Sequence, residues 1–208
     1  AYKPYNYIND DGELDGFEIH LGDELCKRAG LTCEWVKNDW DSIIPNLVSG
    51  NYDTIIAGMS ITDERDEVID FTDPYTQPDP SAYMALSADV NLDGAVIAAQ
   101  TNTIQSGFVA ASGGTLIEFA TADETVAAVR SGEADAVLAD LNYLLPIVDA
   151  EAGLVLLAQQ EMIGGGVGMG IRESDGELRA KFNTAIQSMK ADGSLNALIA
   201  EWGVGEQF

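Results

Sequence analysis

The chain is poor in the residues that bind polyanions and in apolar runs long enough to cross a membrane. Only 10 of its 208 residues are Lys or Arg, against 35 Asp or Glu, and the formal net charge is −25. Without a basic cluster to neutralise phosphates, the sequence excludes nucleic acid and anionic lipid as partners. The longest apolar runs are about five residues, whereas a membrane-spanning helix needs about 20. The acidity indicates either a solvated surface or attraction of cationic ligands.

Histidine and cysteine are also scarce. His20 is the one histidine, and Cys26 and Cys33 are the two cysteines, so the roughly four ligands of a zinc site cannot be assembled. The cysteines are either two unrelated buried thiols or, as we prefer, a disulfide that closes a small loop after a helix around Leu21–Arg28. A disulfide implies an oxidising compartment. No nucleophile elbow, phosphate loop or dinucleotide fingerprint is present, and we expect no metal and no cofactor.

The sequence contains an internal repeat. Residues Ser49–Gly58 read SGNYDTIIAG and residues Ser131–Asp140 read SGEADAVLAD. A helix-like segment precedes each copy, and Gly50 and Gly132 fit a helix end, because glycine accepts a left-handed conformation there. The apolar residues that follow predict two short buried strands. Ligands of open α/β sheets bind beyond the carboxyl ends of such strands.

The alternation of helices and strands predicts an α/β protein with mostly parallel sheets. The segment Leu31–Val36 alternates well enough to be one of the strands. Crossovers near Pro78 and at the glycine run 164–166 predict two lobes: lobe 1 from residues 1–77 plus 166–208, and lobe 2 from the inserted residues 78–165. We expect a ligand cleft between the lobes.

One group of residues after the first repeat suits a carboxylate. The guanidinium of Arg65 can hold a carboxylate through two hydrogen bonds. Ser60 and Thr62 precede a helix-like segment, whose free N–H groups also attract anions. The alternative is that Arg65 pairs with Asp63 or Asp66 on a surface helix.

Two residues of the inserted lobe complete this pattern. Thr103 opens a helix there and offers a hydroxyl and N–H groups to an anion. Asp140, at the tip of the second repeat strand, suits an ammonium group. A cation such as Arg65 and an anion such as Asp140 are what the zwitterion of an α-amino acid requires.

These residues also carry a family resemblance, which covers nearly the whole chain. The chain resembles the polar amino-acid-binding proteins of ABC importers, family 3 of the extracellular solute-binding proteins. The cysteine pair resembles that of the lysine/arginine/ornithine- and histidine-binding members, which have a disulfide at this spacing. The matching stretches are Gly16–Arg28, Trp40–Pro45, Ala57–Tyr75, Leu138–Asp140 and Gly168–Arg172.

In lobe 1 we expect Ala57 and five further residues to bind the ligand, and the resemblance implies a role for each of the five. Tyr2 and Trp40 match aromatic residues that sandwich the ligand side chain, where an aromatic face also suits a cation. Gly58 matches a backbone carbonyl that accepts from the α-ammonium. Ser60 and Arg65 match the carboxylate grip.

In lobe 2 the resemblance implies that Thr103 grips the carboxylate and that Asp140 holds the ammonium. The chain departs from the family in three places. Ala57-Gly58 stands where basic-residue binders typically have Ser-Ser, and Asn102-Thr103-Ile104 stands where Gly-Thr-Thr or Gly-Ser-Thr is frequent. The family's first strand, with an acidic residue just before Tyr2 that helps to recognise the ligand side chain, is not in this sequence.

The resemblance implies a two-lobed, type II periplasmic-binding-protein fold that closes by a hinge motion on a polar L-amino acid. We expect an exported, periplasmic monomer, its signal peptide not in this sequence, that delivers the amino acid to an ABC permease in the inner membrane. A basic amino acid is favoured, with glutamine, other neutral polar residues and opines as alternatives. Two other functions stay open on the same fold: a cyclohexadienyl dehydratase-like enzyme, and the ligand-sensing domain of a receptor.

Overall fold

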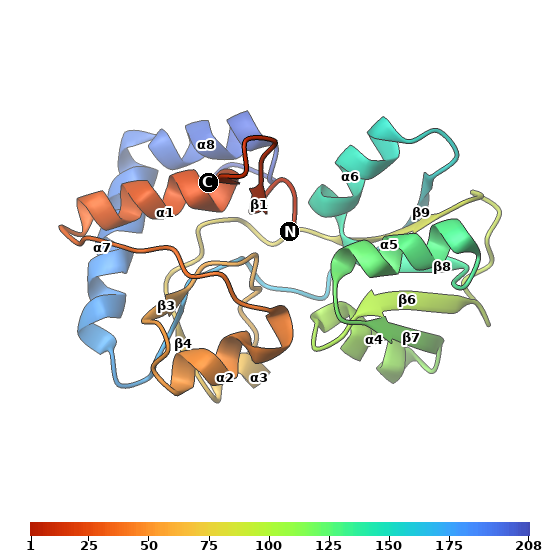
Figure 1. Cartoon of the computed structure of the whole chain (residues 1–208), viewed down its shortest axis with the longest axis horizontal. Coiled ribbons are helices and arrows are strands. Elements are labelled where there is room, and N and C mark those ends of the chain that lie inside the picture. Colours follow the sequence, from red (N-terminus) through yellow and green to blue (C-terminus); the bar gives the residue numbers. More distant parts are fainter. The chain divides into compact units, whose positions relative to one another are not determined.

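The computed structural model describes residues 1–208, which divide into two compact units. We call Asp79–Gly164 the continuous unit, and Tyr2–Pro78 together with Gly165–Phe208 the discontinuous unit (Figure 1). Both contain helices and β-strands, which confirms the α/β class. None of the helices combines the length and the apolar character that a membrane span requires.

A five-stranded sheet forms the centre of the continuous unit, in the order β7-β6-β8-β5-β9. Strand β6 runs parallel to β7 and β8, whereas β5 runs antiparallel to β8 and β9. The strands are β5 (Ser81–Ala85), β6 (Val96–Gln100), β7 (Thr115–Phe119), β8 (Ala136–Asp140) and β9 (Val155–Glu161).

The expectation of mostly parallel sheets is therefore wrong. Strand β5 is the one by which the chain enters the continuous unit after the proline-rich crossover, and β9 is the one before the chain leaves it. Helices link β6 to β7, β7 to β8 and β8 to β9, but β5 lies between β8 and β9, so the parallel neighbours are β6 with β7 and β6 with β8.

Three helices cover this sheet. Helices α4 and α5 pack on β6 and β7, and α6 packs on β5, β8 and β9. Their bounds are α4 (Ile104–Ser112), α5 (Ala122–Ser131) and α6 (Leu141–Ala150). The core between them is apolar and includes Tyr83, Ile97, Val109, Leu138 and Leu157.

In the discontinuous unit, two distant parts of the chain share one small sheet. Strand β10 (Gly170–Ile171) lies between β3 (Thr54–Ile55) and β4 (Asp70–Phe71) and is antiparallel to both. A separate hairpin pairs β1 (Tyr7–Ile8) with β2 (Leu14–Asp15). The remaining elements are α1 (Phe17–Arg28), η1 (Trp40–Ser42), α2 (Ile43–Val48), α3 (Asp63–Asp66), α7 (Gly176–Asp192) and α8 (Ser194–Trp202).

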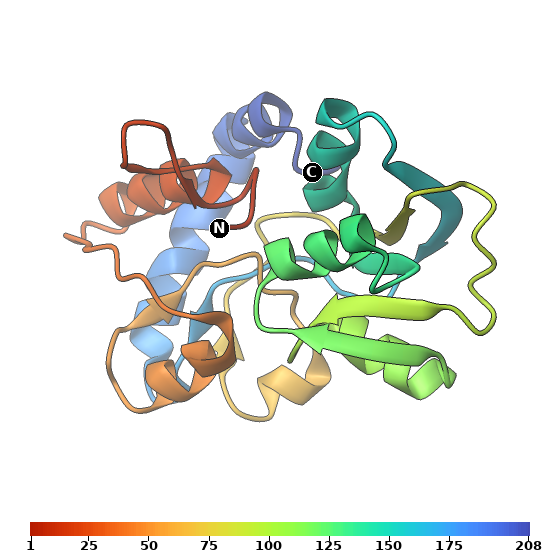
Figure 2. The same ribbon diagram turned by 45° about the vertical axis from the view of Figure 1, so that its right-hand side comes forward.

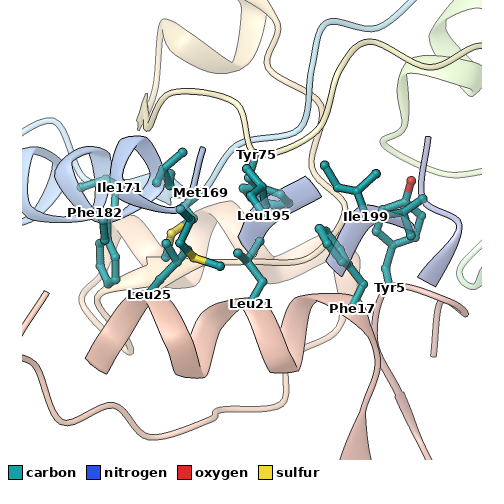
Figure 3. Packing of buried hydrophobic residues seen from close by; sticks show 14 residues of the cluster. Tyr5, Phe17, Leu21, Leu25, Tyr75, Met169, Ile171, Phe182, Leu195 and Ile199 are labelled. Atoms are coloured by element: carbon teal, nitrogen blue, oxygen red, sulfur yellow. The ribbon is translucent and has the colours of Figure 1, made fainter. Parts of the chain in front are cut away.

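The main core of the discontinuous unit lies where α1, α7 and α8 pack together, as Figure 2 shows from a second side. Apolar residues spaced three or four positions apart along these helices are buried in this core. Burying one such side chain stabilises the fold by roughly 1.5–3 kcal/mol. Figure 3 shows the cluster, which includes Phe17, Leu21, Leu25, Phe182, Ile186, Met189, Leu195 and Ile199.

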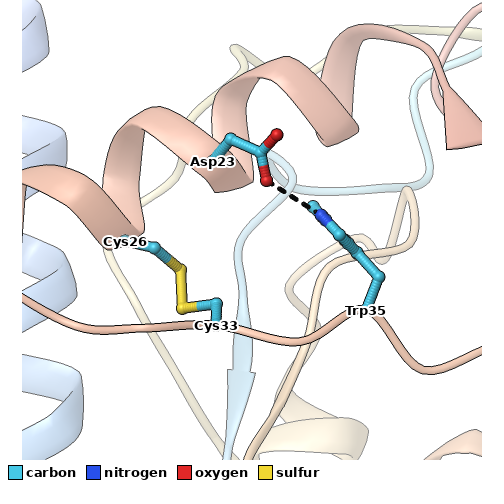
Figure 4. The surroundings of a disulfide bond; sticks show 4 residues. All are labelled: Asp23, Cys26, Cys33 and Trp35. Atoms are coloured by element: carbon cyan, nitrogen blue, oxygen red, sulfur yellow. Dashed lines mark hydrogen bonds between the residues drawn. A yellow bond between two sulfur atoms is a disulfide. The ribbon is translucent and has the colours of Figure 1, made fainter.

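The strand predicted at Leu31–Val36 does not form, because no neighbouring strand pairs with it. A disulfide between Cys26 and Cys33 ties this segment to α1 instead. The indole Nε1 of Trp35 also donates to Oδ1 of Asp23 at 2.9 Å (Figure 4). The Trp35 ring lies so close to α1 that a Cβ at Gly22 would lie 2.6 Å from it.

The two copies of the repeat have the predicted local structure. Gly50 and Gly132 follow helices α2 and α5 with left-handed φ angles of 82° and 77°. Strands β3 and β8 begin a few residues later. The repeat therefore brings the chain to the ends of two strands, one in each unit, from which the candidate binding residues follow.

Candidate functional site

The loop after β3 carries Ala57, Gly58 and Ser60 in a turn that needs glycine. Gly58 has a φ of 61°, in the left-handed region that side chains with a Cβ rarely adopt. A Cβ added there would lie 3.6 Å from Cδ1 of Tyr2. Ala57 packs against the apolar cluster around α2. The structure therefore brings the predicted residues Tyr2 and Gly58 together.

Arg65 lies in α3 and contacts two other predicted site residues. Its Nη1 donates to the carbonyl oxygen of Ser60 at 2.8 Å, and its guanidinium carbon lies 5.4 Å from the ring centroid of Trp40. The hydroxyl of Thr62 caps α3 by accepting from the backbone N–H of Arg65 at 3.2 Å. Trp40, Ser60 and Arg65 thus form one group, in which the arginine is oriented by a carbonyl and an aromatic ring.

Glu18 is a residue of this region that the sequence reasoning missed. It is completely buried in the first turn of α1. Its carboxyl group accepts from the backbone N–H of Gly58 at 2.6 Å, from Nδ2 of Asn6 at 2.8 Å and from the hydroxyl of Tyr75. Burial raises the pKa of Glu18, and these three donors act against that rise.

A signal for Glu18 exists in the sequence. The residue stands three and seven positions before Leu21 and Leu25, on the apolar face of the predicted helix. An acid on an apolar face must find partners or lose its charge. What the pattern does not reveal is which distant residues supply those partners.

In the continuous unit, Thr103 caps the start of α4. Its Oγ1 accepts from the backbone N–H of Ser106 at 3.2 Å and donates to the carbonyl of Gln100 at 2.6 Å. The preceding Asn102 has a φ of 57°. Asparagine tolerates this left-handed conformation better than most residues, which explains how it replaces the glycine frequent in the family.

Asp140 ends β8 and precedes α6. Its Oδ1 accepts from Nε2 of Gln105 at 2.7 Å, and the same Nε2 donates to Oγ of Ser81 at 2.9 Å. Gln105 is buried, with 5% of its surface exposed. Like Glu18, it is a polar residue on a buried helix face that sequence reasoning missed.

Thr103 and Asp140 lie at one edge of the same sheet. Thr103 closely follows the end of β6, Asp140 is the last residue of β8, and these neighbouring strands are parallel. Gln105 links the start of α4 to the Asp140 carboxylate. The continuous unit therefore presents, at this edge, a helix N-terminus suited to an anion and a carboxylate suited to a cation.

The chain is similar to known proteins over almost its whole length. The family model of the bacterial extracellular solute-binding proteins, family 3, matches residues 1–205. The histidine-binding periplasmic protein of Escherichia coli (strain K12) is 32% identical, over 97% of this chain and 84% of that protein.

Solved structures agree with this match. A periplasmic His/Glu/Gln/Arg/opine family-binding protein from Silicibacter pomeroyi, in complex with lysine, is 68% identical, with a TM-score of 0.94 over 97% of this chain and 93% of the other. An ancestral amino-acid-binding protein, described as a precursor of cyclohexadienyl dehydratase, is 28% identical, with a TM-score of 0.85 over 97% and 91% of the two chains. The fold is that of the type II periplasmic binding proteins, and the chain belongs to family 3 of the bacterial extracellular solute-binding proteins.

Proposed function

We propose that this protein binds a polar L-amino acid, with a basic one favoured, for delivery to an ABC permease. The observation that carries the proposal is the lysine complex of a relative that shares 68% of its sequence and has a TM-score of 0.94. The histidine-binding relative supports the same class of ligand.

The carboxylate of the amino acid is bound, in this proposal, by Arg65 with help from Ser60 and Thr103. Arg65 is already oriented by the Ser60 carbonyl and the Trp40 ring. A guanidinium fixed in one direction loses little conformational freedom when it binds a carboxylate in a bidentate manner. The N–H groups at the start of α4, next to Thr103, add a second source of positive potential.

The α-ammonium is bound by Asp140 and by the carbonyl of Gly58. Gln105 holds the Asp140 carboxylate through Oδ1, and a carboxylate fixed in this way is a strong acceptor for an ammonium group. Ala57 completes the loop that carries Gly58. The side chain of the ligand is expected against Tyr2 and Trp40, since an aromatic face attracts a cation.

Hinge closure follows from this assignment as a prediction. A ligand that interacts with groups of both units stabilises the closed state by its differential affinity for that state. We propose that the permease in the inner membrane recognises the liganded monomer. A periplasmic location agrees with the Cys26–Cys33 disulfide, because disulfides persist in oxidising compartments.

We propose binding without turnover. The related precursor of cyclohexadienyl dehydratase is itself described as an amino-acid-binding protein. A dehydratase needs an acid that touches its substrate. Glu18, whose pKa burial raises, has no exposed surface. It is therefore a poor candidate for that role.

The test is a thermal-shift screen of the ligand-free protein, with calorimetry on each hit. The ligands are lysine, arginine, ornithine, histidine, glutamine and octopine, with glutamate as an acidic comparison. A ligand present at 100 times its Kd stabilises the folded state by about 2.7 kcal/mol, so a basic amino acid should raise the Tm by several degrees. Absence of a shift with all of these compounds would contradict the proposal. Turnover of prephenate or arogenate would favour the enzyme.

A further inference from the structure

Glu18 is the one completely buried acid of the chain, and amino-acid binding as proposed above does not use it. Phe17, the residue before it, and Tyr75, which donates to it, both belong to the main core of the discontinuous unit, where Figure 3 labels them. Keeping a carboxyl group away from water costs several kcal/mol unless hydrogen bonds replace the water. A position maintained at such a cost calls for an explanation beyond packing.

Two of the three donors to Glu18, Asn6 and Gly58, come from segments that carry predicted ligand-binding residues. Asn6 belongs to the same tight turn as Tyr2: the Tyr2 N–H donates to the Asn6 carbonyl at 2.7 Å, and the Asn6 N–H donates to the Tyr2 carbonyl at 3.1 Å. The other donor, Gly58, is itself a predicted ligand-binding residue. One carboxyl group therefore holds both the turn of Tyr2 and the loop after β3.

The bond to Gly58 fixes the direction of the loop. In a trans peptide the N–H and C=O groups point in opposite directions. An N–H of Gly58 aimed at Glu18 therefore turns the Ala57 carbonyl away from the core. The next carbonyl, the one proposed to accept from the α-ammonium, is that of Gly58 itself, whose φ of 61° is left-handed. The Tyr2 ring lies beside this glycine.

We propose that Glu18 is a positioning residue for the ligand: through Asn6 and Gly58 it fixes the Tyr2 ring and the 57–60 loop in their binding geometry. The inference rests on the proposed amino-acid binding. It assigns to Glu18 no contact with the ligand.

The test substitutes Glu18→Met, which keeps the length and apolar volume of the side chain but removes both acceptor oxygens. The Gly58 N–H and the Asn6 amide then lose their partner, and the loop relaxes to find water. We expect the Kd for lysine to rise at least tenfold. In Glu18→Gln, Oε1 still accepts from Gly58, and a rotated Asn6 amide can accept from Nε2. This variant should therefore restore the Kd to within about threefold, which is roughly 0.6 kcal/mol.

Tyr75→Phe is the matched control, because it removes a donor to Glu18 that belongs to no ligand-binding segment. It should lower the free energy of unfolding while leaving the Kd for lysine within twofold. NMR of the ligand-free protein separates loss of the Glu18–Gly58 hydrogen bond from general destabilisation. The amide proton of Gly58 should resonate downfield in the parent and in Tyr75→Phe, and should move upfield in Glu18→Met.

If Glu18→Met does not fold, Asn6→Ala tests the inference in its place. This variant removes only the hydrogen bond between Glu18 and the turn of Tyr2, and it should raise the Kd for lysine severalfold. A parent that binds lysine while Glu18→Met, or Asn6→Ala in its place, binds it equally well overturns this inference and leaves the proposed function intact. A parent that binds no amino acid overturns the proposed function and this inference with it.

Discussion

At the scale of single residues, the charged groups proposed to meet the ligand are held by other groups of the protein. Arg65 is oriented by the Ser60 carbonyl, and Asp140 by Gln105. Such preorganisation favours binding, because little side-chain entropy is lost when the ligand arrives. It also means that the residues behind the charged ones, Gln105 and Glu18, influence the affinity without touching the ligand.

Replacing Asp140→Asn tests the ammonium site with a side chain of the same shape. We expect the Kd for lysine to rise about thirtyfold, equivalent to about 2 kcal/mol, because a charge-assisted hydrogen bond to the ammonium is lost. Calorimetry measures the change. Asp149→Asn, at an exposed position on the helix that Asp140 precedes, removes the same charge and should leave the Kd unchanged. An unaltered Kd in Asp140→Asn would place the ammonium elsewhere.

Tyr83 makes the fold sensitive to alkaline pH. Burial, and then the neighbouring Glu161, raise the pKa of Tyr83 to about 12. An unfolded tyrosine loses its proton near pH 10, so between pH 10 and 12 the unfolded state binds fewer protons than the folded state. The free energy of unfolding should therefore fall as the pH rises through this window. Urea unfolding at a series of pH values measures the slope, which Tyr83→Phe should make shallower; an equal slope in both proteins would contradict the assignment.

At the scale of helices and strands, two threonine caps allow a matched comparison. Thr103 caps α4 beside the proposed carboxylate site, and Thr121 caps α5 with a complete capping box. Each substitution to alanine should lower the free energy of unfolding by about 1 kcal/mol. Only Thr103→Ala should also raise the Kd for lysine, by about fivefold, through loss of a hydroxyl near the carboxylate.

Calorimetry and urea unfolding of both threonine variants, measured side by side, separate the two effects. Equal affinities in Thr103→Ala and Thr121→Ala would show that Thr103 is a structural cap and nothing more. A loss of affinity in Thr121→Ala would show instead that general destabilisation, rather than a local contact, controls the Kd.

The elements that depend on local pattern could be predicted from the sequence. Strand β8, helix α1 and the two C-terminal helices follow from apolar spacing, and glycines mark the ends of the three helices. Interactions between distant residues could not be predicted in this way. The segment 31–36 alternates like a strand but has no partner strand, and the two-residue strands β1, β2 and β4 are too short to produce a periodic signal.

In the candidate site, too, some residues could be predicted from local pattern and others could not. Arg65, Thr103 and Asp140 stand out because each follows a predicted strand and carries chemistry suited to an amino acid. Their ligand-binding roles stay predictions. Glu18 and Gln105 did not stand out, because their importance lies in hydrogen bonds to Gly58 and Asp140, which only the folded chain brings within reach.

At the scale of the whole molecule, the net charge of −25 means that repulsion among carboxylates opposes the attraction within ion pairs. Surface ion pairs such as Arg130–Glu151 and Arg172–Asp53 stabilise the fold, but each contributes at most about 1 kcal/mol. With 10 basic residues against 35 acidic ones, most carboxylates have no basic residue to pair with, and they repel one another. Repulsion should therefore outweigh attraction in the compact state.

Added salt should consequently stabilise the protein. The screening length falls from about 30 Å at 0.01 M to about 10 Å at 0.1 M ionic strength, which suppresses repulsion among distant carboxylates more than attraction within close pairs. Urea unfolding of the ligand-free protein at these two salt concentrations, at pH 7, should show a higher free energy of unfolding at the higher one. Near pH 4, where many Asp and Glu side chains are protonated, the same increase in salt should have a much smaller effect. A decrease in stability with salt at pH 7 would mean that the few ion pairs, rather than the acidic excess, dominate the electrostatics of this fold.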